Sequence, residues 1–195
     1  DHSGLADHLL DLARTRLQFA GEYVDDSRRL SDLVRPGRLI VVDLRDELID
    51  KDEALGLFVV LLRIVSNASQ PGQSFNKLVV FDEAHKYVEN QDLVAGLVDV
   101  VREMRHKGTS VLVASQDPPS VPVSLIELSS QIILHRFNSP GWLKHIQRAN
   151  ASLGTLTPEL PAHHAPGEAF VWSGKATDAA FAHGAVKIRC RPRVT

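Results

Sequence analysis

The stretch KLVVFDEAHKYV, residues 77–88, joins an apolar run to two adjacent carboxylates, Asp82 and Glu83. Residues 77–81 have the β-branched and aromatic composition of a buried strand, and the acids follow where that strand ends. Carboxylates beside a buried strand are unfavourable unless a cation, a hydrogen-bond donor or a helix start stabilises them. Two interpretations stand at this point: the pair orients a magnesium nucleotide, or Asp82 caps a helix whose first turn contains Glu83.

Strand and helix signals alternate on both sides of this stretch. We expect strands within 35–46 (ending in Asp43), at 77–81, 110–114 and 131–135, helices at 5–19, 54–65, 92–107, 123–128 and 141–149, and a closing hairpin of strands 168–172 and 186–190. This alternation predicts an α/β fold with a parallel sheet covered by helices on both faces. In such sheets the chemistry lies beyond the carboxyl ends of the strands, where Asp43, Asp82, Glu83 and Gln116 fall.

Composition limits the class of protein. The chain has 195 residues, is 44% hydrophobic and has a formal net charge of -2, so it can form a packed core and is not a bulk basic nucleic-acid binder. Its one cysteine, Cys190, excludes an internal disulfide framework and fits a reducing, cytoplasmic compartment. The longest apolar run, residues 54–65, is too short to span a membrane and contains Arg63. Because the sequence starts with Asp1, we expect it to be a piece of a longer chain.

Three further side chains have the chemistry of a nucleotide site. Arg102 and Arg105 lie three residues apart on one face of the expected helix, and guanidinium groups match phosphate oxygens. The plain alternative is a solvated basic face near the end of a helix. Gln116 follows the strand expected at 110–114 and can bind the attacking water or a terminal phosphate, or it can simply open a turn.

The order of these elements carries a resemblance to a known family. FDEAH at 81–85, REMRHKG at 102–108 and VLVASQDPPSV at 111–121 resemble the pattern of the HerA/FtsK superfamily of ring-forming, ATP-driven DNA motors. Similar stretches continue outside these three: RPGRLIVVDL at 35–44, SSQIILHRFNSPGWLKHI at 129–146 and GEAFVWSG at 167–174. The resemblance covers residues 35–189, which is most of the chain.

The resemblance implies a RecA-like parallel sheet flanked by helices, lacking its phosphate-loop strand, with a small C-terminal β-hairpin. Residues 1–160 would be a partial ATPase core and residues 161–195 a C-terminal β extension. The full-length protein would assemble into a ring, expected to be a hexamer, and couple hydrolysis of ATP with Mg2+ to movement along double-stranded DNA. Members of the family act in DNA end processing and anti-phage defence, which implies a nuclease or another defence-system component as a partner.

The same resemblance implies roles for individual residues. Asp82 would hold Mg2+ through its water shell, and Glu83 would be the catalytic acid that activates water. Gln116 would sense the γ-phosphate of ATP. Arg105, with Arg102 as the second choice, would reach the nucleotide of a neighbouring subunit as an arginine finger in trans.

Some of the sequence departs from the family pattern. The residue after Gln116 is Asp117, where the family usually has arginine, and the helix expected at 141–149 is preceded by Ser-Pro. A phosphate loop of the form G-x-x-x-x-G-K-[ST] does not occur in the sequence; its single Gly-Lys pair, at 174–175, precedes Ala176. Half of an ATPase site is therefore expected here, inactive without the other half.

Two other functions remain open. A DEAH-box helicase fragment would also contain Asp-Glu-Ala-His, but Ser-Ala-Thr is expected later, where this chain has Ala-Ser-Gln at 114–116. A non-catalytic regulatory or structural subunit could keep an ATPase-like fold and pack against active subunits.

Two other groups of residues give no specific signal. The histidines show no spacing typical of a zinc site. The alternating basic residues of the C-terminal strand fit either a solvated edge or a phosphate contact: Lys187, Arg189, Arg191 and Arg193.

Overall fold

A computed structural model describes residues 8–11, 14–15, 29–44, 51–69, 75–86 and 91–191, apart from the side chains of residues 91–93 and 105. The chain divides into two compact units, Asp1–Val41 and Val42–Thr195. In the first unit, residues 8–11 and 14–15 are helical, as expected, and a short helix α2 spans Leu30–Leu33. The rest of the helix expected at 5–19 lies outside the described residues.

The strand expected within residues 35–46 does not form over the described residues 38–44. The Pro-Gly turn before it is present: Gly37 has φ 75° and the backbone N–H of Arg38 donates to Arg35 O at 3.3 Å. Leu39 and Val41 remain 89% and 81% exposed. A β-branched run becomes a strand only when a second strand satisfies its backbone groups, and no strand of the described residues forms a ladder with this segment.

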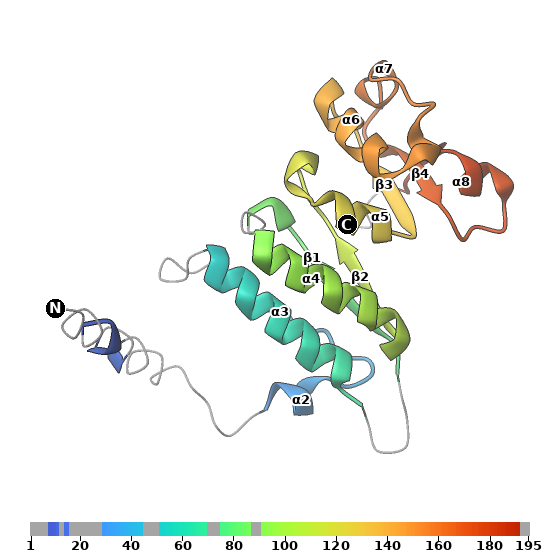
Figure 1. The fold of residues 1–195 in the computed structure, drawn as a ribbon. Helices are drawn as coiled ribbons and strands as arrows, with labels where there is room; N and C mark the ends of the chain where they lie inside the picture. The colour runs from blue at the N-terminus through green and yellow to red at the C-terminus, as the bar shows by residue number, and fades with distance from the viewer. Residues whose placement is uncertain are drawn as a thin grey trace. The chain divides into compact units, whose positions relative to one another are not determined.

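A strand–helix–strand unit forms the centre of the second unit (Figure 1). Strand β1 (Lys77–Phe81) pairs in parallel with β2 (Thr109–Val113), with Lys77 opposite Thr109 and Phe81 opposite Val113. Helix α4 (Gln91–Met104) connects the two strands, and α3 (Lys51–Asn67) packs beside it with two acids in its first turn. The predicted parallel pair and both helices are therefore confirmed.

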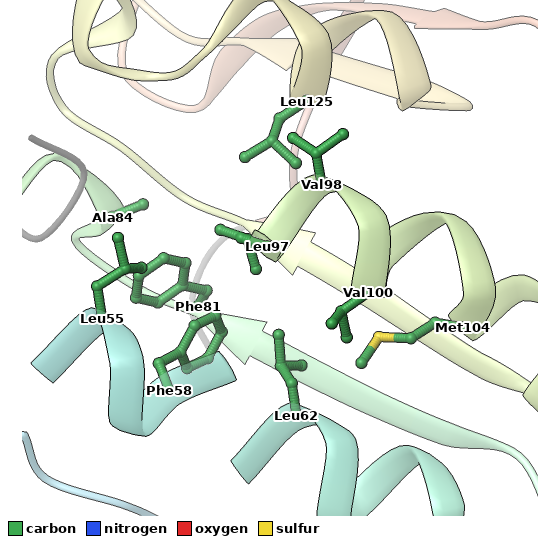
Figure 2. Close-up of a cluster of buried hydrophobic side chains, with 10 residues drawn as sticks. All are labelled: Leu55, Phe58, Leu62, Phe81, Ala84, Leu97, Val98, Val100, Met104 and Leu125. Carbon is green, nitrogen blue, oxygen red and sulfur yellow. The ribbon is translucent and has the colours of Figure 1, made fainter. Parts of the chain in front are cut away.

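One face of this parallel sheet carries the main hydrophobic core. Figure 2 shows how side chains from α3, β1, the 3-10 turn Ala84–Lys86, α4 and the short helix α5 (Val123–Leu128) meet there: Leu55, Phe58, Leu62, Phe81, Ala84, Leu97, Val98, Val100, Met104 and Leu125. The rings of Phe58 and Phe81 stack with centroids 3.8 Å apart. On the other face, Leu78, Val80 and Leu112 are 65%, 54% and 45% exposed. Over the described residues, helices therefore cover one face of the sheet and not the expected two.

Helix α4 ends as its sequence predicts. After Met104 it tightens into a 3-10 turn, Arg105–Lys107, and Gly108 then adopts the left-handed conformation with φ 61°. The backbone N–H of Lys77 donates to Gly108 O at 2.9 Å. The end of the helix thus lies beside the first residue of β1, at the opposite end of that strand from Asp82.

A three-stranded antiparallel sheet follows in the chain. Strand β3 (Gln131–Leu134) pairs with β4 (Glu168–Ser173), and β4 pairs with β5 (Val186–Arg189). The expected closing hairpin is thereby confirmed, whereas the strand expected at 131–135 joins that hairpin and does not extend the parallel sheet. The helices of this part are α6 (Pro140–Ala149), α7 (Glu159–Ala162) and α8 (Ala179–His183), with 3-10 turns at Pro118–Ser120 and Ala151–Leu153.

Strand β3 joins the antiparallel sheet because it contributes to a second hydrophobic core. Residues of β3, α6, the segment after α6 and β4 share it: Leu134, Leu143, Ile146, Leu153, Leu156 and Phe170. Because Leu134 lies directly opposite Phe170, pairing with β4 buries both side chains against α6. Ser139 begins that helix, with its Oγ accepting the backbone N–H of Trp142 at 3.4 Å. In the part of the chain that the structure describes, no helix is long and apolar enough to cross a membrane.

Candidate functional site

The candidate site lies where β1 and β2 end. Backbone hydrogen bonds continue past both strands: Ala114 N–H donates to Phe81 O at 2.9 Å, and Ala84 N–H donates to Ala114 O at 3.0 Å. These bonds place the Asp82–Glu83 turn next to the Ser115–Gln116 turn. The expectation that the acids and Gln116 meet at one edge of a parallel sheet is therefore correct for the backbone.

The backbone of Glu83 is strained. Its φ of 53° makes it the one non-glycine residue with positive φ in the described part of the chain. Such a conformation costs of order 1–3 kcal/mol and persists where the surroundings fix it, often at functional sites. Asp82 Oδ1 accepts the N–H of Glu83 at 3.0 Å, and the N–H of Lys86 donates to Glu83 O at 2.9 Å, so the turn is bonded on both sides.

This geometry bears on the helix-cap interpretation of the acid pair. A single 3-10 turn, Ala84–Lys86, follows Glu83, and helix α4 begins only at Gln91. Asp82 therefore bonds to a tight turn and does not cap α4. The buried Ala84, 1% exposed, holds that turn against the core.

Three side chains of the described residues contact the carboxylate of Glu83, which is 31% exposed. Gln116 Nε2 donates to Oε1 at 2.6 Å. The ring of His85 lies on the other oxygen, with Nε2 3.5 Å from Oε2, and Lys86 Nζ lies 3.4 Å from the same atom. Each oxygen of Glu83 thus has partners from a different loop.

These contacts determine the ionisation of Glu83. Burial by itself would raise the pKa of this carboxyl group. The hydrogen bonds from Gln116 and Lys86 and the nearby charges of Lys86 and His85 outweigh burial and hold the pKa of Glu83 below its usual value. The side chain is therefore an anion at neutral pH, able to orient a water molecule through its lone pairs.

Asp82 provides one exposed carboxylate beside this group. In the described residues, no group of three or more His, Cys, Asp or Glu side chains is arranged to hold a metal ion by itself. Mg2+ in phosphoryl-transfer sites is bound by one or two carboxylates, water and the phosphates of the nucleotide, so it needs no such group. Asp82, directly after β1, fits that mode of binding.

The arginine candidates lie at the other end of the parallel sheet. Arg102 is in the last turn of α4, where its Nη1 is 3.3 Å from Asp99 Oδ1 and both side chains are exposed. Arg105 opens the 3-10 turn that leads to Gly108; its side chain is outside the described atoms. The five residues of β1 separate that end from Glu83 by about 13 Å. The structure therefore does not bring either arginine to the acids of its own subunit.

Asp117 forms part of a tight loop after Gln116. Ser115 Oγ accepts the N–H of Asp117 at 3.1 Å, and Ser120 Oγ donates to Asp117 O at 2.7 Å. A 3-10 turn at Pro118–Ser120 completes the loop. The backbone groups of Asp117 thus belong to a stiff turn that fixes the backbone next to Gln116.

Sequence reasoning missed His85 and Lys86 as partners of Glu83. Their spacing of two and three residues from Glu83 was visible, but the contacts depend on the left-handed backbone of Glu83. In an α-helix, a residue two positions after Glu83 would lie on a different face, so His85 would not contact the Glu83 carboxylate.

Comparison with solved structures agrees with this architecture. No family model and no curated protein matches the sequence. The genome-packaging NTPase B204 from Sulfolobus turreted icosahedral virus 2 in complex with AMPPCP superposes with a TM-score of 0.61 at 14% identity, over 85% of this chain and 73% of that one. The chain has an ATPase-like α/β fold.

Two further structures extend the comparison. The DNA-packaging ATPase B204 from Sulfolobus Turreted Icosahedral Virus gives a TM-score of 0.62 at 15% identity, with 88% of this chain and 76% of that chain covered. The virus 2 NTPase with ATP-gammaS gives 0.59 at 14% identity, covering 85% and 72%. At these identities the likeness concerns the fold, and the α/β class predicted from sequence is confirmed.

Proposed function

We propose that this chain is the part of an ATP-driven DNA motor, of the HerA/FtsK type, that runs from the metal-binding and water-activating acids to the C-terminus. The contact between Gln116 Nε2 and Glu83 Oε1, 2.6 Å across the joined ends of two parallel strands, carries the proposal. It brings together the two side chains that ATP hydrolysis needs beside the γ-phosphate: an anion that orients water and an amide that donates hydrogen bonds.

Each side chain has a definite task in this proposal. The Glu83 carboxylate, ionised because its pKa is lowered, accepts a hydrogen bond from the attacking water and aligns it with the γ-phosphorus. The amide of Gln116 has two N–H groups, so one can remain on Glu83 while the other donates to a γ-phosphate oxygen. Asp82 would hold Mg2+ through water, and the bound metal supplies neutralisation of the phosphate charge.

The phosphate cradle has to come from a segment outside this sequence. The exposed apolar face of the parallel sheet supports this, since Leu78, Val80 and Leu112 face away from the covered side. Parallel sheets are normally buried on both faces, and two strands are too few for an independent sheet. A further strand and helix that carry the phosphate loop would complete both the sheet and the nucleotide site.

The position of the arginines supports a ring. Arg102 and Arg105 lie too far from Glu83 to reach the same nucleotide, yet they lie at one exposed end of the unit. In a head-to-tail ring that end can face the nucleotide of the next subunit. We therefore propose that the protein forms a hexamer in which Arg105, or Arg102 as the second choice, acts in trans on the nucleotide of the next subunit. The likeness to a DNA-packaging ATPase supports double-stranded DNA as the translocated polymer.

ATP hydrolysis by the full-length protein tests the proposal. Glu83→Gln keeps the size of the side chain but removes its charge and replaces one acceptor oxygen by a donor, so turnover should fall by about 100-fold or more. Glu103→Gln is the matched control, because Glu103 is exposed on α4 and pairs only with Lys107 among the described residues. Equal turnover by the two variants would instead favour a non-catalytic subunit.

A further inference from the structure

His85 is a second candidate for a role at the site, and nothing in the proposed reaction has used it. Its side chain is 22% exposed and lies on the 3-10 turn Ala84–Lys86. Ring atom Nε2 faces Oε2 of Glu83 at 3.5 Å. Ring atom Nδ1 is buried and has no hydrogen-bond partner among the described residues. Among the described residues, the one polar contact of this ring is therefore to Glu83.

The two oxygens of Glu83 are held from opposite sides. Gln116 reaches Oε1 from the loop after β2, while His85 reaches Oε2 from the turn after β1. The last torsion of a glutamate side chain is soft, so one contact alone leaves the carboxylate plane free to rotate. Two contacts on different oxygens fix the plane, and with it the direction of the lone pairs.

Lys86 contacts the same oxygen but cannot fix a direction as well. Its ammonium group is 3.4 Å from Oε2 at the end of a flexible side chain that is 51% exposed. Exposed ion pairs of this kind are screened by water and contribute little. The His85 ring has two torsions and is largely enclosed, so its position is set by the turn.

We propose that His85 is a positioning residue that fixes the orientation of the Glu83 carboxylate and so aligns the water that attacks the nucleotide. The inference rests on the proposed role of Glu83 in ATP hydrolysis. A carboxylate only accepts hydrogen bonds, so in this role the ring presents an N–H at Nε2 toward it. The buried Nδ1 then carries the lone pair in the neutral ring.

This geometry specifies which replacement retains function. In His85→Gln the amide nitrogen reaches the distance of Nε2 and still donates, whereas His85→Ala removes the donor. Misplacement of a reacting group by about 1 Å can cost about 100-fold in rate. We expect kcat for ATP to fall about 10- to 100-fold in His85→Ala, with KM for ATP changed less than about twofold, and kcat to recover to within about fivefold of wild type in His85→Gln.

His183→Ala is the matched control, since His183 is an exposed histidine at the end of α8. We expect its kcat to stay within about twofold of wild type. A loss as large as that of His85→Ala would show that the effect is not specific to the contact with Glu83 and would overturn the positioning role. A rise in KM without a change of kcat in His85→Ala would overturn it as well.

A structural measurement keeps the inference separate from the proposed function. Crystal structures of full-length wild type and His85→Ala should differ at Glu83: one carboxylate orientation on Gln116 in the wild type, and a rotated or doubled orientation in the variant. An unchanged carboxylate in His85→Ala contradicts the inference even if the protein hydrolyses ATP. Full activity of Glu83→Gln contradicts the proposed function instead, whatever the orientation of Glu83.

Discussion

The side-chain amide of Gln116 donates to Oε1 of Glu83 at 2.6 Å, although the two residues are 33 positions apart in the chain. The contact depends on the parallel pairing of β1 with β2, which brings the carboxyl ends of both strands to one edge. It also depends on the left-handed backbone of Glu83, which directs the turn toward the neighbouring loop. The fold thus brings an anion and an amide together at one edge of the sheet.

Removal of this amide should lower the rate of ATP hydrolysis. In Gln116→Ala, Glu83 loses the donor on Oε1 and the γ-phosphate loses an electrostatic partner, so we expect kcat to fall about 100-fold. Steady-state ATPase assays of the full-length protein measure this. Gln131→Ala, at an exposed position at the start of β3, is the control and should behave as wild type. A Gln116→Ala protein with full activity would remove Gln116 from the mechanism.

Lys77 should stabilise the fold through the end of α3. Its Nζ donates to the carbonyls of Ser66 at 3.0 Å and Ala68 at 2.8 Å, and it lies 5.0 Å from the centre of the Phe75 ring. A cation at a helix C-terminus satisfies carbonyls that lack helical partners. Lys77→Met should therefore lower the free energy of unfolding by about 2 kcal/mol, as judged by urea denaturation.

The exposed Lys144 on α6 provides the comparison for that variant. Lys144→Met should change the free energy of unfolding by less than about 0.5 kcal/mol. Two variants with the same small effect would show that the Lys77 hydrogen bonds contribute nothing to stability.

His164 should make stability sensitive to acid. Its side chain is buried, both ring nitrogens lack hydrogen-bond partners among the described residues, and Nδ1 lies 3.8 Å from Glu168 Oε2. Burial and the charge of Lys187 lower the pKa of His164, and the nearby Glu168, which opposes them, does not compensate. His135 also faces the group and lowers its pKa further.

The direction of the pH effect follows from this lowered pKa. The unfolded chain binds a proton near the ordinary value of 6.5, whereas the folded chain resists it, so stability is complete above that pH and falls as pH decreases toward the folded pKa. Glu168, whose pKa is lowered by its hydrogen bonds to Lys187 and Ala165, adds a loss of the same sign at lower pH. We expect a lower Tm at pH 5.5 than at pH 8 for the wild type.

His164→Phe removes the titrating ring and should reduce that difference in Tm. The aromatic replacement keeps the contact with Phe170, whose ring centroid is 4.7 Å away. His163→Gln changes the adjacent, exposed histidine and should keep the wild-type dependence on pH. The same loss of Tm on acidification in His164→Phe as in wild type would assign the effect to other groups.

Several features of the fold could be predicted because they depend on nearby residues. The bounds of β1 and α5 match the prediction, since composition and turn residues define both. The helix expected at 92–107 is followed directly by Gly108, which has the left-handed backbone that often ends a helix. The meeting of Glu83 with Gln116 followed from the general rule for parallel strands.

Other features depend on partners far away in the chain. Residues 38–44 have strand-like composition but find no strand to pair with among the described residues. Strand β3 was assigned to the wrong sheet because its partner, β4, lies more than thirty residues further on and the choice depends on a shared core with α6. The contact between His85 and Glu83 could not be predicted, because it requires a positive φ that glutamate rarely adopts.

The most direct test of the central claim is ATP hydrolysis by the full-length protein, with and without double-stranded DNA, for wild type, Glu83→Gln, Arg105→Ala and an equimolar mixture of the two variants. The account predicts that the wild type turns over ATP, that each variant alone is inactive, and that mixing restores part of the activity because a Glu83 from one subunit meets an Arg105 from the next. Wild-type rates in both variants would contradict the account and leave the Asp82–Glu83 pair as a structural turn.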